Sequence, residues 1–144
     1  MLVPMRAILD AADKNGYAQG AFNVNAVCQV KAAVDVHQIL RSPAIIQGAD
    51  LANGFMGGRT DFANSTLEDK KAGAKNIGAA VKKYAADSDI PVALHLDHGK
   101  NFDSCIAAIE GGYTSVMIDG SSLPFDENVE LTRDVVKYAH VRGV

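Results

Sequence analysis

The sequence predicts an α/β protein built on a parallel β-sheet. Short apolar runs alternate with longer segments of helical period, four times along the 144 residues. Strands that alternate with helices in this way form parallel sheets joined by right-handed crossovers. The runs are apolar on both faces, as expected for parallel strands that helices cover. Two architectures remain open on these grounds, an open doubly wound sheet and a closed barrel.

Local patterns predict where each element begins and ends. The turn signal Asn15-Gly16 precedes the first run, and Pro43 sets off the second because proline disfavours helix in the residue before it. Ser65 and Glu68 have the spacing of a capping box, which predicts the start of a helix. Residues 51–64 are expected to form a long loop. The expected strands are residues 18–24, 44–46, 91–96 and 115–118, and the expected helices are residues 26–41, 65–86, 102–110 and 126–140.

The composition narrows the classes of function. Apolar residues make up 48% and charged residues 22% of the chain, which argues against disorder. The net charge is -3, with no basic patch, so nucleic acid is not an expected partner. No apolar run approaches the ~20 residues that cross a bilayer, and residues 1–6 lack the core of a signal peptide. Cys28 and Cys105 lack metal-motif spacing, so we expect two buried free thiols in a reducing cytoplasm.

Polar side chains occur near the carboxyl end of every predicted strand. Because the carboxyl ends of parallel strands meet at one edge, where the active sites of α/β proteins lie, we expect one polar cluster there. An Asn or Asp in this position can instead cap the following helix, but four consecutive strands that end this way favour a shared site. The residues are Asn23, Gln47, His95 with Asp97, and Asp119.

His98 needs a separate explanation. Side chains alternate along a strand, so His95 and Asp97 share one face and His98 would point to the other. His98 can join the cluster only if the chain turns, which Gly99 would permit. Two interpretations of His98 remain, a metal ligand and a histidine satisfied by ordinary hydrogen bonds.

Residues 91–99 (PVALHLDHG) resemble the signature of class II fructose-bisphosphate aldolases and the related tagatose-bisphosphate aldolases. Residues 17–25, 42–47 and 114–121 agree with the same family in order and spacing, as do residues 123–128 with Ala139-His140. The resemblance spans essentially the whole chain. It implies an α/β fold of the (β/α)8 TIM-barrel type, in which residues 1–144 would cover the first four βα units, the N-terminal half of a single barrel domain.

The resemblance also implies roles for four residues. Asp97 corresponds to the catalytic acid/base, which exchanges a proton with the C4 oxygen of the sugar as the C3–C4 bond breaks or forms. His98 corresponds to a ligand of the catalytic zinc, Zn²⁺. Asp119 corresponds to a carboxylate that binds a second cation, divalent or monovalent, in some members. Asn23 corresponds to a residue that contacts the dihydroxyacetone-phosphate portion.

The implied activity is the metal-dependent cleavage of fructose 1,6-bisphosphate to dihydroxyacetone phosphate and glyceraldehyde 3-phosphate, with tagatose bisphosphate as an alternative substrate. Zinc would polarise the ketone and stabilise the enediolate as a Lewis acid. The competing aldolase chemistry uses a lysine Schiff base, whose lysine would point from a strand into the site. Lysine positions favour the metal, because all nine fall in predicted helices or loops: Lys14, Lys31, Lys70, Lys71, Lys75, Lys82, Lys83, Lys100 and Lys137.

Two departures from the family qualify this interpretation. Ala49 stands where many members carry a serine that helps to hold a substrate phosphate. A full barrel needs about 250 residues, and the family's other zinc histidines would lie beyond Val144. One imidazole falls short of the three protein ligands usual for catalytic zinc. An inert half-barrel is therefore the alternative to an active enzyme.

A half-barrel would expose the edges of its first and fourth strands and part of one apolar face. We expect such a chain to form a homo-oligomer, for example with two halves closing one barrel.

Overall fold

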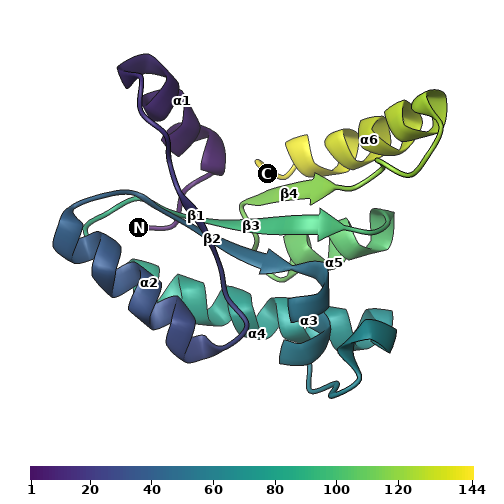
Figure 1. Cartoon of the computed structure of the whole chain (residues 1–144), viewed down its shortest axis with the longest axis horizontal. Helices are drawn as coiled ribbons and strands as arrows, with labels where there is room; N and C mark the ends of the chain where they lie inside the picture. The colour runs from purple at the N-terminus through teal and green to yellow at the C-terminus, as the bar shows by residue number, and fades with distance from the viewer.

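A computed structural model describes residues 1–144 and contains one four-stranded parallel sheet (Figure 1). Its strands are β1 (Ala21–Asn23), β2 (Ala44–Ala49), β3 (Val92–Gly99) and β4 (Ser115–Ile118), hydrogen-bonded in the order β1-β2-β3-β4. Each crossover thus joins spatial neighbours, as in a barrel, whereas the strand order of a doubly wound sheet reverses at a switch point. The predicted parallel α/β architecture is confirmed.

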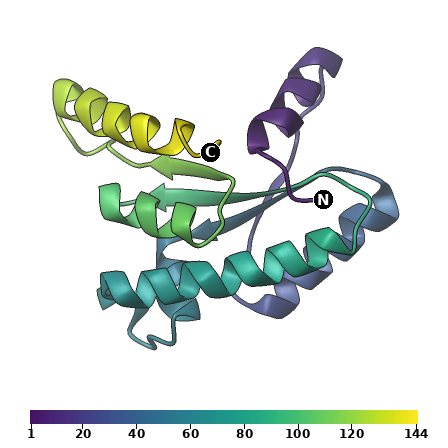
Figure 2. The same ribbon diagram turned by 180° about the vertical axis from the view of Figure 1, so that it is seen from behind.

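The helices that follow the strands cover one face of the sheet (Figure 2). Leu94 and Leu96 of β3 belong to a core cluster of 18 buried residues that also contains Ile77 and Val81 from the long helix. Burial of these apolar side chains is the main source of stability for the layer. No helix has the length and apolar character needed to span a membrane. The covering helices are α2 (Val27–Leu40), α4 (Leu67–Ala86), α5 (Phe102–Glu110) and α6 (Phe125–His140).

A helix that was not predicted, α1 (Met5–Asn15), lies on the opposite face of the sheet (Figure 1). Its Ile8 packs against Ile45 and Ala93, which lie early in β2 and β3, in a second cluster of 3 buried residues. The Asn15-Gly16 signal marks the end of this helix, because Gly16 forms the left-handed C-cap at φ 68°. α1 thereby covers the amino-terminal end of the inner face and leaves the carboxyl ends of the strands open.

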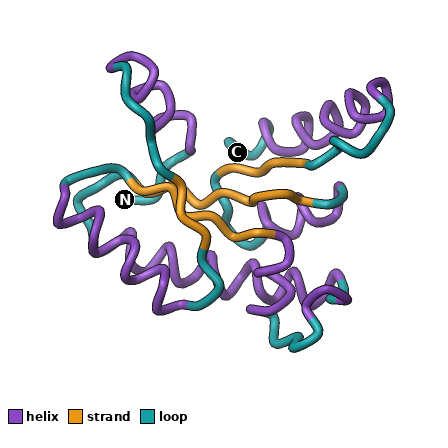
Figure 3. Tube along the Cα trace, in the orientation of Figure 1, coloured by secondary structure: helices purple, strands orange, loops and turns teal.

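Two predictions between β2 and α4 are wrong (Figure 3). The expected loop at residues 51–64 contains the helix α3 (Asp50–Met56) and the 3-10 turn η1 (Phe62–Asn64). The capping box lies one residue later than expected, because Thr66 Oγ1 accepts from the Asp69 amide at 3.2 Å while Asp69 Oδ2 accepts from the Thr66 amide at 2.8 Å. Thr66 and Asp69 therefore start α4, and Ser65 and Glu68 do not.

The two cysteines differ in exposure, which corrects the expectation of two buried thiols. Cys105 is buried, and burial raises the pKa of its thiol to about 12. Cys28 is exposed because α2 buries Val30 and Val34 and presents position 28 to solvent. The sequence around Cys28 does not show which side of the helix is buried, because apolar residues lie both before and after it along the chain.

We expect a thiol reagent at about pH 8 to modify Cys28 rapidly and Cys105 only after unfolding, because the thiolate is the reactive species. Mass spectrometry should find one adduct on the native chain and two adducts in urea. Cys28→Ser should remove the fast adduct. Equal rates at both cysteines in the native state would contradict the structure.

Candidate functional site

Three of the predicted site residues come together at the carboxyl ends of β3 and β4. His98 Nδ1 lies 2.8 Å from Oδ2 of Asp119, the residue that follows β4. His98 Nε2 lies 3.7 Å from Oδ1 of Asp97, its neighbour on β3. The side chains of Asp97 and Asp119 are largely shielded, at 20% and 28% exposed, while His98 is 62% exposed. An imidazole thus lies between two carboxylates at the rim of the sheet.

The backbone conformation at His98 explains why its side chain lies beside Asp97, although strict alternation along the strand would place the two on opposite faces. His98 takes a left-handed conformation at φ 53°, and the β3–β4 register shifts between Leu96 and Gly99. Such irregularities re-aim side chains and are common beside functional sites. The predicted turn is confirmed, but it occurs at His98 itself. Gly99 is needed for space, because a Cβ there would lie 2.8 Å from the Met117 carbonyl oxygen.

Hydrogen bonds hold Asp119 as a carboxylate. Its Oδ1 accepts from the Ser121 hydroxyl at 2.6 Å and from the Ser121 amide at 3.1 Å. These bonds, together with the one to His98, lower the pKa of Asp119 to about 2. The pKa of His98 is raised, first by the hydrogen bond to Asp119 and then by the charge of Asp97. At neutral pH, Asp119 therefore remains ionised and keeps the His98 ring in place.

We expect Asp119→Asn to lower the pKa of His98, because it removes the largest cause of the upward shift. A titration of the histidine Cε1 protons by NMR measures this directly. Asp103→Asn, an exposed carboxylate on α5, is the matched control and should leave His98 unchanged. A His98 titration that is the same in both variants would contradict the hydrogen bond.

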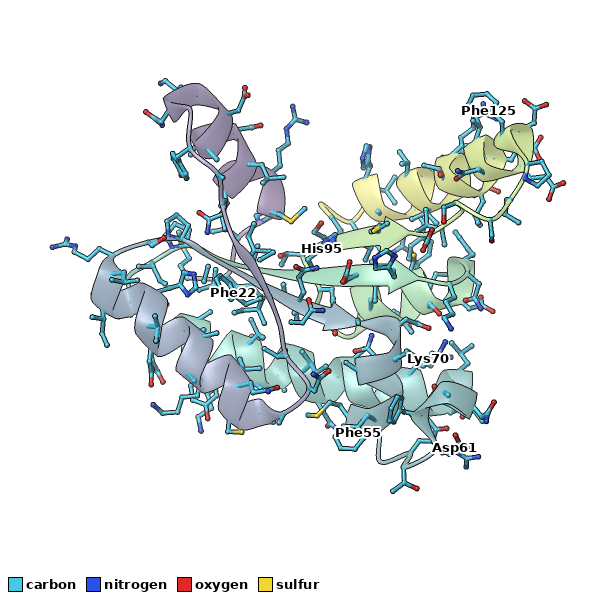
Figure 4. The ribbon with its side chains drawn as sticks, in the orientation of Figure 1. Phe22, Phe55, Asp61, Lys70, His95 and Phe125 are labelled. Atoms are coloured by element: carbon cyan, nitrogen blue, oxygen red, sulfur yellow. The ribbon has the colours of Figure 1, made fainter.

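A polar row crosses all four strands one layer below Asp97. Asn23 pairs with Gln47, Gln47 with His95, and His95 with Ser115 in the register of the sheet. His95 Nδ1 lies 2.8 Å from Ser115 Oγ. Burial lowers the pKa of His95, against the opposing charge of Asp97, so its imidazole is neutral at pH 7. In Figure 4, His95 lies beside β3 and β4, whereas Lys70 lies near α3.

Asn23 stands apart from the Asp97, His98 and Asp119 group. It is in the same polar row as His95 but two strands away, on the exposed edge strand, and no hydrogen bond joins it to the three rim residues. Ala49, where the resemblance led us to expect a serine, pairs with Asp97 in the β2–β3 ladder. The position expected to hold a substrate phosphate therefore lies beside the predicted acid/base.

The residues present fit one zinc ligand but not a complete zinc site. If Nδ1 of His98 donates to Asp119, Nε2 keeps a free lone pair, which is the usual way in which a carboxylate orients a metal-binding imidazole. No group of three or more His, Cys, Asp or Glu side chains is arranged to hold a metal ion. Catalytic zinc takes three protein ligands, so the chain supplies only part of such a site.

The other histidines and the lysines lie where the sequence predicted. His37 on α2 is buried, lies 2.7 Å from the Ala33 carbonyl oxygen through Nδ1, and packs edge-on against Phe22. His140 ends α6 and lines a pocket with Thr114 and Ser115, at the amino-terminal end of β4 and away from the carboxyl ends of the strands. No lysine lies on a strand, as predicted.

Comparison with known proteins identifies relatives along the whole chain. The family described as "Fructose-bisphosphate aldolase class-II" matches residues 3–144. Fructose-bisphosphate aldolases of Treponema pallidum (strain Nichols) and Geobacillus stearothermophilus are each 41% identical over 99% of this chain, which covers 40% and 45% of those proteins. A 6-phospho-5-dehydro-2-deoxy-D-gluconate aldolase of Bacillus licheniformis is 38% identical, over 99% of this chain and 44% of that protein. The chain thus spans less than half the length of these relatives.

Solved structures agree with the fold. The YdjI aldolase of Escherichia coli K12 superposes on 100% of this chain with a TM-score of 0.80 and 29% identity, and the match covers 48% of that chain. A fructose-bisphosphate aldolase of Campylobacter jejuni superposes on 99% of this chain with a TM-score of 0.83 at 22% identity, covering 45% of that chain. The four βα units therefore align with about half of a known barrel.

Proposed function

We propose that this chain, which belongs to the class II fructose-bisphosphate aldolase family, supplies the acid/base and one zinc ligand for aldol cleavage and condensation of a ketose 1,6-bisphosphate. The observation that carries the proposal is the pair Asp97 and His98 at the end of β3, with His98 turned by the irregular register toward both carboxylates. Residues 1–144 would then form the N-terminal half of one barrel domain.

Asp97 would carry the proton of the reaction. In cleavage, the C4 hydroxyl of the sugar gives its proton to the Asp97 carboxylate while the C3–C4 electrons pass to C3 and a C4 aldehyde forms. In condensation, Asp97 returns this proton to the C4 oxygen. A carboxyl group that is mostly shielded from water suits both steps, because its proton is less readily lost to solvent.

The remaining residues would bind and orient. When bound, zinc would supply a Lewis acid for the negative charge of the enediolate. His98 would contribute one ligand nitrogen, Nε2, and Asp119 would hold the ring through Nδ1 and carry the site for a second cation. Asn23 would contact the dihydroxyacetone-phosphate portion, from the same polar row as His95.

Fructose 1,6-bisphosphate is the substrate that we propose, because the family and both relatives at 41% identity carry that name. The products would be dihydroxyacetone phosphate and glyceraldehyde 3-phosphate. A relative of a different printed activity is 38% identical over the same range, so identity does not separate the substrates. Tagatose bisphosphate, which differs at C4, is the alternative, and assays with both sugars decide between them.

A chimera tests the function. Residues 1–144 would replace the matching segment of the Geobacillus stearothermophilus aldolase. The rest of that aldolase would supply the other half of the barrel. We expect the chimera to cleave fructose 1,6-bisphosphate and to lose activity with chelator. We expect the isolated chain to be inert, because it supplies one imidazole ligand, His98, where catalytic zinc takes three protein ligands. A folded, zinc-loaded chimera without cleavage would refute the proposal. Zinc-dependent cleavage by the isolated chain would refute the conclusion that the chain supplies too few zinc ligands.

We also propose that the 144-residue chain self-associates. Its proposed location is the cytoplasm, where its free thiols would stay reduced. Large apolar side chains are exposed along both edges, including Ile39 at 79% and Leu40 at 68% on α2, and Phe125 and Val141 at 80% each near α6. Association would remove these exposed apolar side chains from water. Size-exclusion chromatography should give a mass above the 15.2 kDa of one chain. A monomer at high concentration would contradict this expectation.

A further inference from the structure

The inner face of the sheet changes from apolar to polar to charged along the strands. Ile45 and Ala93 form an apolar layer that Ile8 of α1 covers. Two residues further along each strand comes the row that contains Gln47 and His95, and two further comes Asp97. Because a strand rises ~3.3 Å per residue, His95 lies about 7 Å below Asp97 on the same face. The polar row is therefore the first layer beyond the apolar residues that α1 covers.

Polar groups in this row lack partners within the protein. The side chains of Asn23 and Gln47 make no hydrogen bond, and His95 makes one, to Ser115 through Nδ1. His95 and Gln47 are each half-buried, so they are neither hidden in the core nor free in solvent. The hydrogen bond to Ser115 occupies Nδ1 of His95, and no hydrogen bond within the protein occupies Nε2. Nε2 of His95 is available to a ligand.

We propose that His95 is a further substrate-binding residue of the site, which binds a hydroxyl group of the phosphorylated sugar through Nε2 while Ser115 holds Nδ1. The inference rests on the proposed function and deepens it. A neutral imidazole has one donor and one acceptor, and Ser115 uses one of them. The other fits a sugar hydroxyl, which both donates and accepts. Gln47, beside His95 in the register, adds an amide that suits the same class of ligand.

The test measures binding of fructose 1,6-bisphosphate by calorimetry to the 144-residue chain and to its His95→Ala and His95→Phe variants. His95→Phe keeps a ring of similar size and separates lost hydrogen bonding from lost volume. His140→Ala, an exposed histidine at the end of α6, is the control. In parallel, NMR follows the Nε2 shift of His95 in the unaltered chain during the same titration, so that a variant that fails to fold does not decide the result.

We expect both His95 variants to bind about 3- to 10-fold more weakly, as for the loss of one neutral hydrogen bond, and His140→Ala to bind normally. The Nε2 shift of His95 should move and saturate with the binding constant that calorimetry gives. Normal binding by His95→Phe, or an Nε2 shift that does not move at saturation, would overturn the inference alone. Absence of binding by the unaltered chain and by His140→Ala together would overturn both this inference and the substrate-binding part of the proposed function.

Discussion

Replacement of Lys70 by Met is expected to reduce the free energy of unfolding by about 3–5 kcal/mol, because it leaves a buried carboxylate without its partner. Asp50 at the start of α3 is 2% exposed and pairs through Oδ2 with Lys70 Nζ of α4, whose side chain is 14% exposed. The other oxygen, Oδ1, is buried without a hydrogen-bond partner. The ion pair is therefore the only side-chain interaction that compensates the buried charge, beside the favourable position of Asp50 in the first turn of α3.

Lys71→Met is the matched control for this prediction. Lys71 lies one residue further along α4 and pairs with Glu68, whose side chain is 82% exposed, so its loss should cost less than about 1 kcal/mol. Urea unfolding monitored by circular dichroism gives both values. Equal losses in the two variants would show that Asp50 is not held as a buried carboxylate.

Replacement of Asp97 by Asn in the chimera is expected to lower the cleavage rate by about 10²–10⁴-fold, the range lost with a general acid/base. Asparagine keeps the shape of the side chain but cannot exchange the proton with the C4 oxygen. Steady-state assays with fructose 1,6-bisphosphate measure the effect.

Asp103→Asn, on the exposed side of α5, is the control and should leave the rate within about twofold of the unaltered chimera. A rate for Asp97→Asn that matches this control would remove Asp97 from the chemistry.

The sequence predicted best where the local pattern and the tertiary structure agree. The helix Phe102–Glu110 and the strand Ser115–Ile118 occur at the expected residues. The side chain of Asn101 caps the start of the helix, and Gly111-Gly112 ends it before the buried Tyr113. Patterns of this strength need no distant contact to define them. The convergence of Asp97 and Asp119 also followed from strand alternation and parallel order.

The elements that were missed depend on contacts that the sequence does not display. The position of α1 depends on the packing of Ile8 against Ile45 and Ala93 on the inner face of the sheet. α3 begins at Asp50, and the burial of Asp50 requires Lys70 of α4, which lies 20 residues further along the chain. The left-handed backbone at His98 results from the register shift between β3 and β4, so only the assembled sheet shows how this histidine turns toward the carboxylates.

The most direct test of the proposed site is the zinc content of the chimera, measured on the same preparations as its cleavage rate, in the Asp97→Asn and His98→Ala variants. We expect the two residues to separate. Asp97→Asn should keep its zinc and lose turnover, whereas His98→Ala should lose zinc because one of three ligands is gone. If His98→Ala keeps both zinc and turnover, or if Asp97→Asn loses its zinc, the assignment of proton carrier and metal ligand to these two neighbours is wrong.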